Sequence, residues 1–344
     1  MASAGLRRIW RVIAAGIAAL ALLGVVSAAG AAEPRAAEEA ATLDDLLAAV
    51  VHIETEISAK ARTAEVLGTA REGSGVVISK DSLILTIGYL ILEARQVTVT
   101  TQDGRRGPAA VVGYDPYTGF GLIRSLKPIA AKPAAFGKSS ALKPEDPLLV
   151  VHGDVDGTER VQSAVLVSSR TFAGYWEYLL EGALFTSPPV EAHAGAALFD
   201  RNLKLVGIGS LFVRDASEGM ELPGNMFVPI DAVVPVLPEL IRQGRAGGPA
   251  RPWLGVIVTE VLEHVLITRV NPESPAALAG LHAGDIVVEV AGKPVTSMET
   301  LYRAVWGLGA AGVSVPMKVL QRSSLRDLQV KSQDRHNYYK SAAD

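Results

Sequence analysis

Short apolar runs separated by Gly, Pro, Asp and Ser fill the middle of the chain, from about residue 66 to residue 213. The runs are Gly75–Ile78, Leu83–Thr86, Val97–Thr100, Ala109–Val112, Leu148–Val151, Val161–Val167 and Leu205–Ile208. Runs of this length, bounded at close intervals by turn-forming residues, predict the strands of a β-barrel or sandwich. We therefore expect a mainly β domain over this part of the chain.

The flanks of this region have a different pattern. Leu43–Glu54 predicts a helix followed by a first strand, and Val233–Gln243 carries apolar residues at helical spacing. The segment 244–250 is short and rich in Gly, which is typical of a linker between domains. The pattern thus divides the chain into one domain over residues 47–243 and a second that begins at residue 251.

The N-terminus has the layout of a secretory signal peptide. Arg7, Arg8 and Arg11 precede an apolar run over residues 12–32 that ends in small residues, which predicts cleavage near Ala31 or Ala32. The run also approaches the ~20 residues that span a bilayer, so an uncleaved inner-membrane anchor is the alternative. Residues 33–46 are expected to be a flexible lead-in, and the protein to be periplasmic or otherwise exported.

Composition excludes several classes of function. The formal net charge of −3 gives no electrostatic reason to bind nucleic acid. The chain has no cysteine, which removes disulfides, thiolate metal sites and cysteine nucleophiles. The six histidines are scattered without the spacing of metal ligands. We expect no metal and no cofactor.

Three segments resemble the active-site segments of the HtrA/Deg family of trypsin-like serine proteases. They are Gly73–Ser79 running on to Ile84–Ile91, Tyr114–Ile123, and Glu191–Asp200 followed by Leu205–Ile208. In that family the first segment carries a catalytic His, the second an Asp and the third a Ser. The resemblance places Tyr89, Gly119 and Ala194 at these positions.

None of these three residues can perform the family's chemistry. Ala194 has no hydroxyl, Gly119 has no carboxylate, and the phenol of Tyr89, with a pKa near ~10, is a poor base at neutral pH. Losing a whole triad costs roughly a millionfold in rate. We therefore predict that the chain is not a protease. The alternative is a displaced site, for which the sequence offers only scattered candidates, namely His193, His152, Ser74, Thr186 and Ser187.

Residues 251–331 resemble the PDZ domain that follows the protease domain in the same family. The matching segments are Arg251–Val256, Asn271–Ala277, Ala279–Val287 and Val290–Val295, with a helical stretch over Ser297–Gly307. The resemblance implies a trypsin-like double β-barrel followed by an α+β PDZ domain, with residues 332–344 as a loose polar tail. It covers nearly everything from about residue 47 to residue 330.

A PDZ domain adds a peptide to a sheet edge and holds the peptide's carboxylate with backbone N–H groups. Here those groups would come from Leu254, Gly255 and Val256. Leu301 and Val305 are four residues apart on one helix face, and they either line a side-chain pocket or belong to the core. Ser297 is a suitable N-cap for that helix.

An aromatic group in the first domain has two possible roles. Trp176 lies between Tyr175 and Tyr178, and the three rings form either an exposed contact patch or ordinary packing. The sequence leaves both open.

The functional hypothesis is an exported HtrA-like pseudoprotease. Its partners would be C-terminal or unfolded protein segments and an active HtrA-like relative, with a membrane contact only if residues 12–32 stay uncleaved. The family commonly forms trimers, so an oligomer is possible. A serine endopeptidase using displaced residues and a holdase chaperone are the alternatives.

Overall fold

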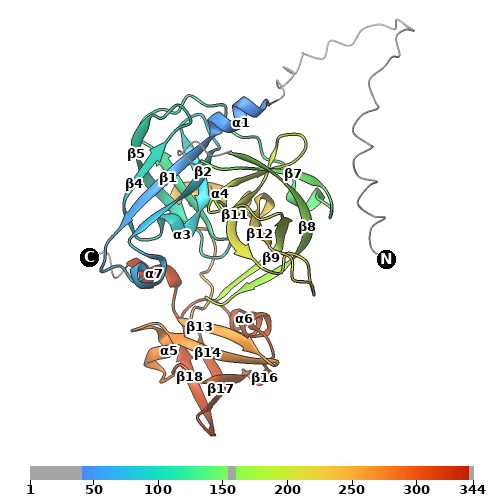
Figure 1. Ribbon diagram of the computed structural model, residues 1–344. Helices are drawn as coiled ribbons and strands as arrows, with labels where there is room; N and C mark the ends of the chain where they lie inside the picture. Colours follow the sequence, from blue (N-terminus) through green and yellow to red (C-terminus); the bar gives the residue numbers. More distant parts are fainter. Residues whose placement is uncertain (1–40, 154–159, 341–344) are drawn as a thin grey trace, which may run out of the picture. The chain divides into compact units, whose positions relative to one another are not determined.

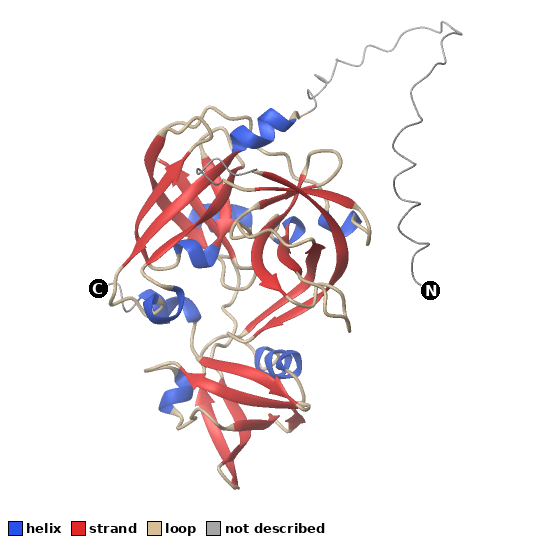
Figure 2. Cartoon of the chain, in the orientation of Figure 1, coloured by secondary structure: helices blue, strands red, loops and turns tan. Residues whose placement is uncertain are grey.

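Two closed barrels of antiparallel strands form the first part of the structure (Figures 1 and 2). The computed structural model describes residues 41–153 and 160–340. The predicted signal peptide or anchor, residues 1–32, therefore lies outside the described residues. The mainly β architecture with paired barrels confirms the prediction.

The first barrel has the strand order β1-β2-β3-β6-β5-β4. Its strands are β1 (Val50–Ile57), β2 (Ala70–Val77), β3 (Leu83–Ile87), β4 (Ala94–Thr100), β5 (Arg106–Tyr114) and β6 (Phe120–Ser125). Its helices are α1 (Leu43–Ala49), α2 (Ala64–Leu67) and α3 (Gly88–Ile91). Leu43–Glu54 thus forms a helix and then a strand, as predicted.

The second barrel has the order β10-β11-β12-β9-β8-β7. Its strands are β7 (Pro147–Val151), β8 (Val161–Gly174), β9 (Tyr178–Ser187), β10 (Ala197–Phe199), β11 (Leu205–Val213) and β12 (Gly224–Pro229). Two short 3-10 turns, η2 (Ser139–Ala141) and η3 (Ile230–Ala232), precede β7 and follow β12, and α4 (Leu237–Gln243) comes next. The longest strands, β8 and β9, form a hairpin.

The two barrels share one core. Ile87 and Phe120 of the first barrel belong to the same buried apolar cluster as Phe185 and Phe199 of the second. Every residue of β3 is buried, because one face of this strand fills its own barrel and the other is covered. This packing places the end of β3 at the junction between the barrels.

The C-terminal domain is a separate antiparallel sheet of order β13-β14-β15-β17-β18, with β16 paired to β15. Its strands are β13 (Val256–Val261), β14 (His264–Val270), β15 (Ile286–Val290), β16 (Lys293–Pro294), β17 (Ser314–Gln321) and β18 (Ser324–Lys331). Its helices are α5 (Pro275–Leu278) and α6 (Met298–Trp306). The Ser297 hydroxyl accepts a hydrogen bond from the Thr300 N–H, which confirms Ser297 as the N-cap of α6.

Residues 332–344 were expected to form a loose polar tail, but the structure shows that residues 333–340 are ordered against the rest of the protein. Gln333 pairs with Trp253 through two backbone hydrogen bonds, and α7 (Arg335–Lys340) follows. The Tyr338 ring is buried, with its centroid 4.6 Å from that of Trp253. The segment is largely polar, but the Tyr338 ring, the Arg245–Asp334 ion pair and the hydrogen bond between the His336 ring and the Tyr114 carbonyl hold it in place.

Candidate functional site

Tyr89 closes the junction between the barrels with a hydrogen bond. It lies on α3, directly after β3, and its hydroxyl donates to the carbonyl of Ser210 on β11 at 2.8 Å. Burial raises the pKa of Tyr89 well above its ordinary value. The phenol therefore stays protonated and acts as a hydrogen-bond donor that ties α3 to β11.

Gly119 adopts a backbone conformation that most residues avoid. Its φ is +86°, and a Cβ built there would lie 3.2 Å from the Tyr178 hydroxyl. The neighbouring Asp115 is fully buried, and its carboxylate accepts hydrogen bonds from the Tyr117 N–H and from the N–H and hydroxyl of Thr118. Asp115, the acidic residue of the segment Tyr114–Ile123, thus stabilises the turn in which it lies.

Ala194 lies in a loop packed against β2. Its carbonyl accepts a hydrogen bond of 2.8 Å from the Ser74 N–H, and the next N–H, of Gly195, donates to the Gly209 carbonyl at 2.9 Å. A Cβ at Gly195 would meet the Ser74 carbonyl oxygen at 2.0 Å. The methyl group of Ala194 offers no nucleophile in this loop.

The candidates for a displaced site are hydrogen-bonded elsewhere or buried. The His193 Nδ1 lies 3.2 Å from the Val190 carbonyl, and no hydroxyl within residues 41–153 and 160–340 forms a hydrogen bond with this ring. The Ser187 hydroxyl donates to the Pro223 carbonyl at 2.9 Å, and the Ser74 hydroxyl accepts from the Gly153 N–H. Thr186 and His152 are both buried.

The backbone N–H groups predicted to hold a carboxylate do hold one, and it comes from this chain. Leu254 donates to Glu177 Oε2 at 2.9 Å, while Gly255 and Val256 donate to Glu177 Oε1 at 2.6 and 3.0 Å. Gly255 has φ +86°, and a Cβ there would lie 2.2 Å from Ser274 Cβ. Glycine is therefore required for the shape of this loop.

Glu177 ends the three-residue turn that joins β8 to β9. Its φ of +57° is the left-handed conformation in which hairpin turns of this length usually place glycine. The turn also pairs with the sheet edge, because the Val258 N–H of β13 donates to the Tyr175 carbonyl at 2.9 Å. The hairpin tip thus combines a captured carboxylate with a sheet-like hydrogen bond, as a PDZ-bound peptide does.

Helix α6 holds the hairpin tip from the other side. The Tyr302 hydroxyl donates to the Gly174 carbonyl at 2.7 Å and accepts from the Glu177 N–H at 3.3 Å. On the exposed flank Arg303 forms an ion pair with Glu181 of β9. Both ends of the turn are therefore fixed by one buried tyrosine.

The predicted pocket residues of α6 lie in the core. Leu301 and Val305 are 1% and 2% exposed and belong to the apolar cluster of the C-terminal domain. Leu179 of β9 is part of the same cluster. Apolar packing as well as hydrogen bonding thus joins the hairpin to this domain.

Glu177 and Arg335 are both buried, and their charges influence each other. Burial raises the pKa of Glu177, while the N–H groups of Leu254, Val256 and Gly255 and the charge of Arg335 act to lower it. Burial in turn works to lower the pKa of Arg335, but Tyr339, Tyr114 and Glu177 outweigh burial and raise it. Arg335 is therefore charged.

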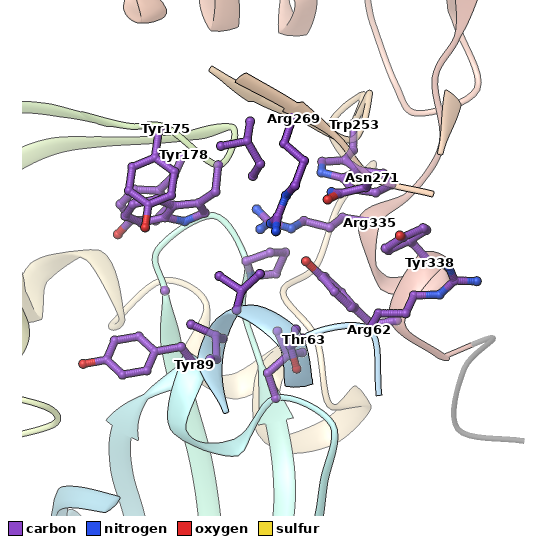
Figure 3. A pocket seen from close by; sticks show the side chains of 18 of the residues that line it. Arg62, Thr63, Tyr89, Tyr175, Tyr178, Trp253, Arg269, Asn271, Arg335 and Tyr338 are labelled. Atoms are coloured by element: carbon purple, nitrogen blue, oxygen red, sulfur yellow. The ribbon is translucent and has the colours of Figure 1, made fainter. Parts of the chain in front are cut away.

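A cavity of about 390 Å³ joins the barrel junction to the edge of the C-terminal sheet (Figure 3). Tyr89 and Gly119 line it from the barrels, and Trp253, Val256 and Ile257 line it from the C-terminal domain. Ala194 is not among the lining residues. The structure thus brings Tyr89 and Gly119, two of the three positions that the resemblance aligns with the triad, to the same cavity as the sheet edge.

Glu177, Tyr302 and Arg335 were missed by the sequence analysis. The aromatic group at Tyr175, Trp176 and Tyr178 was the nearest signal, and its rings pack together: Trp176 stacks on Tyr178 with centroids 5.4 Å apart. Tyr175 remains exposed. The acid between these rings carried no motif that distinguishes it from a surface glutamate.

Comparisons with known families define the class of protein. A trypsin-like peptidase domain matches residues 73–208, and a PDZ domain matches residues 266–320. The chain therefore has a trypsin-like peptidase domain followed by a PDZ domain, and it is similar to HtrA/Deg-type serine proteases. In the part of the chain that the structure describes, no helix is long and apolar enough to cross a membrane.

Individual relatives are distant. A probable periplasmic serine endoprotease DegP-like of Pseudomonas putida (strain W619) is 26% identical over 273 residues, which is 75% of this chain and 55% of that protein. The serine endoprotease DegS of Haemophilus influenzae is 29% identical over 224 residues, 63% of this chain and 64% of that protein. The chain thus spans little more than half the length of the DegP-like relatives.

Solved structures share the fold. A serine endoprotease from Yersinia pestis aligns with a TM-score of 0.51 and 24% identity, over 85% of this chain and 96% of that one. The HtrA-type protease AlgW, solved with a decapeptide, aligns with a TM-score of 0.53 and 20% identity, over 85% and 97%. At these identities the likeness establishes the fold.

Proposed function

We propose that this chain is an exported, non-proteolytic HtrA-like protein whose PDZ domain binds C-terminal or unfolded protein segments. The observation that carries the proposal is that the N–H groups of Leu254, Gly255 and Val256 all donate hydrogen bonds to one carboxylate. A loop that holds a side-chain carboxylate at 2.6–3.0 Å has the geometry to hold the terminal carboxylate of a peptide.

The loss of proteolysis is supported by the side chains in the cleft. Ala194 provides no hydroxyl, and Tyr89 is a buried, protonated phenol that donates to the Ser210 carbonyl. Gly119 provides no carboxylate, and Asp115 is committed to its turn. Peptide hydrolysis by this fold needs a nucleophile, a base and a group that orients the base, and these residues supply none of the three.

The internal ligand makes binding competitive. An external peptide must displace Glu177 from the loop and Tyr175 from the edge of β13. The barrel therefore contributes to function as the scaffold that presents this hairpin. A partner with an apolar C-terminal segment, such as an unfolded exported protein or an active HtrA-like relative, has the matching chemistry.

An exported location is supported by the names of the relatives and by the predicted signal at residues 1–32. The DegP-like proteins are described as periplasmic. The adaptor or regulatory role would then operate among exported proteins.

The first experiment tests for hydrolysis. The purified chain is incubated with unfolded casein and, separately, with a fluorophosphonate probe. No cleavage and no labelled serine are expected. Labelling of Ser187, Ser74 or any other serine would overturn the non-proteolytic interpretation and support a displaced site. Suppressed aggregation of a client that stays intact would instead indicate holdase activity.

The second experiment tests the loop. A fluorescent peptide with an apolar C-terminus is titrated with the full chain, alongside its C-terminally amidated form. The free carboxylate is expected to bind more tightly, and Gly255→Glu is expected to abolish that binding, because a side chain there collides with Ser274 and adds a negative charge. Equal affinity for both peptides, or for both proteins, would remove the loop from the proposal.

A further inference from the structure

Two arginines from separate elements project into the cavity of about 390 Å³ (Figure 3). Arg269 is the penultimate residue of β14, and Arg335 begins α7. Figure 3 shows both guanidinium groups turned toward the middle of the cavity, with the rings of Trp253 and Tyr338 beside them. Two guanidinium groups that point into the same cavity repel each other, and an anion bound between them would remove that repulsion.

Arg335 is buried without a carboxylate partner. Its side chain belongs to a residue only 9% exposed, and its Nε has no hydrogen-bond partner. Within the described ranges, 41–153 and 160–340, no carboxylate oxygen lies within 4.0 Å of its guanidinium. The Tyr339 phenol is its neighbouring polar contact, and the Glu177 carboxylate is already saturated by three N–H groups.

A buried guanidinium that no carboxylate contacts has lost its water, and an anion that reached it from the cavity would replace those lost interactions. The residues that line the cavity do not supply a contacting anion. Glu65 is the one acidic residue among those that line the cavity, and it is exposed. Arg62 also lines the cavity, and its guanidinium is paired with Glu273 at 2.8 Å. The cavity is therefore positive.

The walls are apolar and aromatic. Ile257 and Val270 of the C-terminal sheet, Leu211 of β11 and the rings of Trp176 and Trp253 all line the same space. The volume falls within the ~300–1,000 Å³ of sites that take small organic molecules. A ligand that suits both features has one anionic group and an apolar body.

We propose that this cavity is a binding site for a small organic anion, a carboxylate on an apolar or aromatic body, with its charged group held by Arg269 and Arg335. The site is distinct from the PDZ loop, whose three N–H groups are occupied by Glu177. Its ligand is either a free aliphatic or aromatic carboxylate or the terminal carboxylate of a short apolar peptide, since both present the same chemistry.

The probe for this site is 8-anilinonaphthalene-1-sulfonate, an aromatic anion whose emission rises in apolar surroundings. Because Trp176 and Trp253 line the cavity, bound dye is also detected by energy transfer from tryptophan. The full chain is expected to bind the dye saturably. Arg335→Met and Arg269→Met, which keep an unbranched apolar stem and remove the guanidinium, are each expected to weaken binding about tenfold or more. Arg326→Met, at an exposed position on β18, is the matched control and should bind as the wild type does.

Displacement of the dye identifies the source of the carboxylate. Decanoate that displaces it, where decanol does not, indicates a free carboxylate. Displacement by a valine-terminated tripeptide, but not by its amide, indicates a peptide end. Dye that binds equally to Arg269→Met and Arg326→Met, or no saturable binding by the wild type, would overturn the proposal. If Arg335→Met fails to fold by circular dichroism, the half-exposed Arg269 decides the question alone.

Discussion

The carboxylate of Glu177 accepts a hydrogen bond of 2.6 Å from the backbone N–H of Gly255, a residue 78 positions later in the chain. This contact joins a β-hairpin of the second barrel to the loop of the PDZ domain for which we propose peptide binding. It makes the hairpin an internal ligand, with the carboxylate, the sheet-like bond and the neighbouring apolar contact that a bound peptide would provide.

Removing that carboxylate should make the PDZ loop more accessible. Glu177→Ala removes the acceptor of three N–H groups, which are then free to bind the carboxylate of an external peptide. We expect the affinity for an apolar peptide with a free C-terminus to rise about tenfold, measured by fluorescence anisotropy. Glu221→Ala, at an exposed loop position, is the control and should leave the affinity unchanged. Unchanged affinity in both variants would show that the hairpin does not compete.

The stability contributed by Glu177 should depend on pH with a definite sign. Burial raises its pKa in the folded protein above the ordinary value of 4.5. A carboxyl with a raised folded pKa binds its proton more readily when folded, so its contribution is greatest below the unfolded pKa and falls as pH rises through the folded one. The unfolding free energy of the wild type relative to Glu177→Ala should therefore decline as the pH rises above the ordinary pKa of 4.5 and through the raised folded pKa.

Urea unfolding of both proteins at several pH values gives this difference in unfolding free energy. The contributions of the other carboxyl groups are the same in both proteins and cancel in the difference. A difference that grows with pH would mean that the N–H groups and Arg335 outweigh the burial of the carboxylate, and that the pKa of Glu177 is lowered by folding instead of raised.

Tyr302→Phe should loosen the hairpin while keeping the ring. The substitution removes the hydroxyl that bonds the Gly174 carbonyl and the Glu177 N–H, and leaves both groups buried without that partner. We expect a loss of about 1–3 kcal/mol in unfolding free energy and faster hydrogen exchange at residues 174–178. Arg303→Ala, which breaks the exposed ion pair with Glu181, should cost at most about 1 kcal/mol. Equal effects of the two variants would contradict the structural role of the Tyr302 hydroxyl.

Restoring the three side chains of the triad should not restore proteolysis. In the variant Tyr89→His, Gly119→Asp, Ala194→Ser, the new Asp would need a left-handed backbone and a Cβ 3.2 Å from the Tyr178 hydroxyl. The new His would also lose the hydrogen bond that now ties α3 to Ser210. Casein cleavage should stay at the level of the wild type, with the DegS relative as the active reference. Cleavage that disappears when residue 194 is returned to Ala would refute this expectation.

Much of the fold could be predicted from local patterns. The apolar runs at Leu83–Thr86 and Leu148–Val151 lie within β3 and β7, and Ser297 caps α6. These features depend on neighbours in sequence, which a single chain displays. The β8–β9 hairpin was only partly predicted, because nothing in Val161–Val167 indicates that the strand extends to Gly174 and reaches another domain.

The sequence predicts the loop that holds the carboxylate but not the residue that supplies it. The loop at Leu254, Gly255 and Val256 could be located because residues 251–331 resemble a PDZ domain. Its occupant could not, because Glu177 lies far away in sequence and has the chemistry of any surface acid until folding buries it. Arg335 was hidden for the same reason: the three-dimensional fold, rather than its neighbours along the chain, determines what surrounds it.

The hairpin that occupies the loop belongs to the same polypeptide chain as the loop, and this affects how the loop can be regulated. A tethered ligand has an effective concentration fixed by geometry, often in the millimolar range for short tethers, and diluting the protein does not lower it. The fraction of free loops is therefore the same at every expression level. At a given pH, under the proposed function, the abundance, clustering or multivalency of incoming protein tails changes the occupancy of the loop, so this chain would report on its partners' concentration rather than its own.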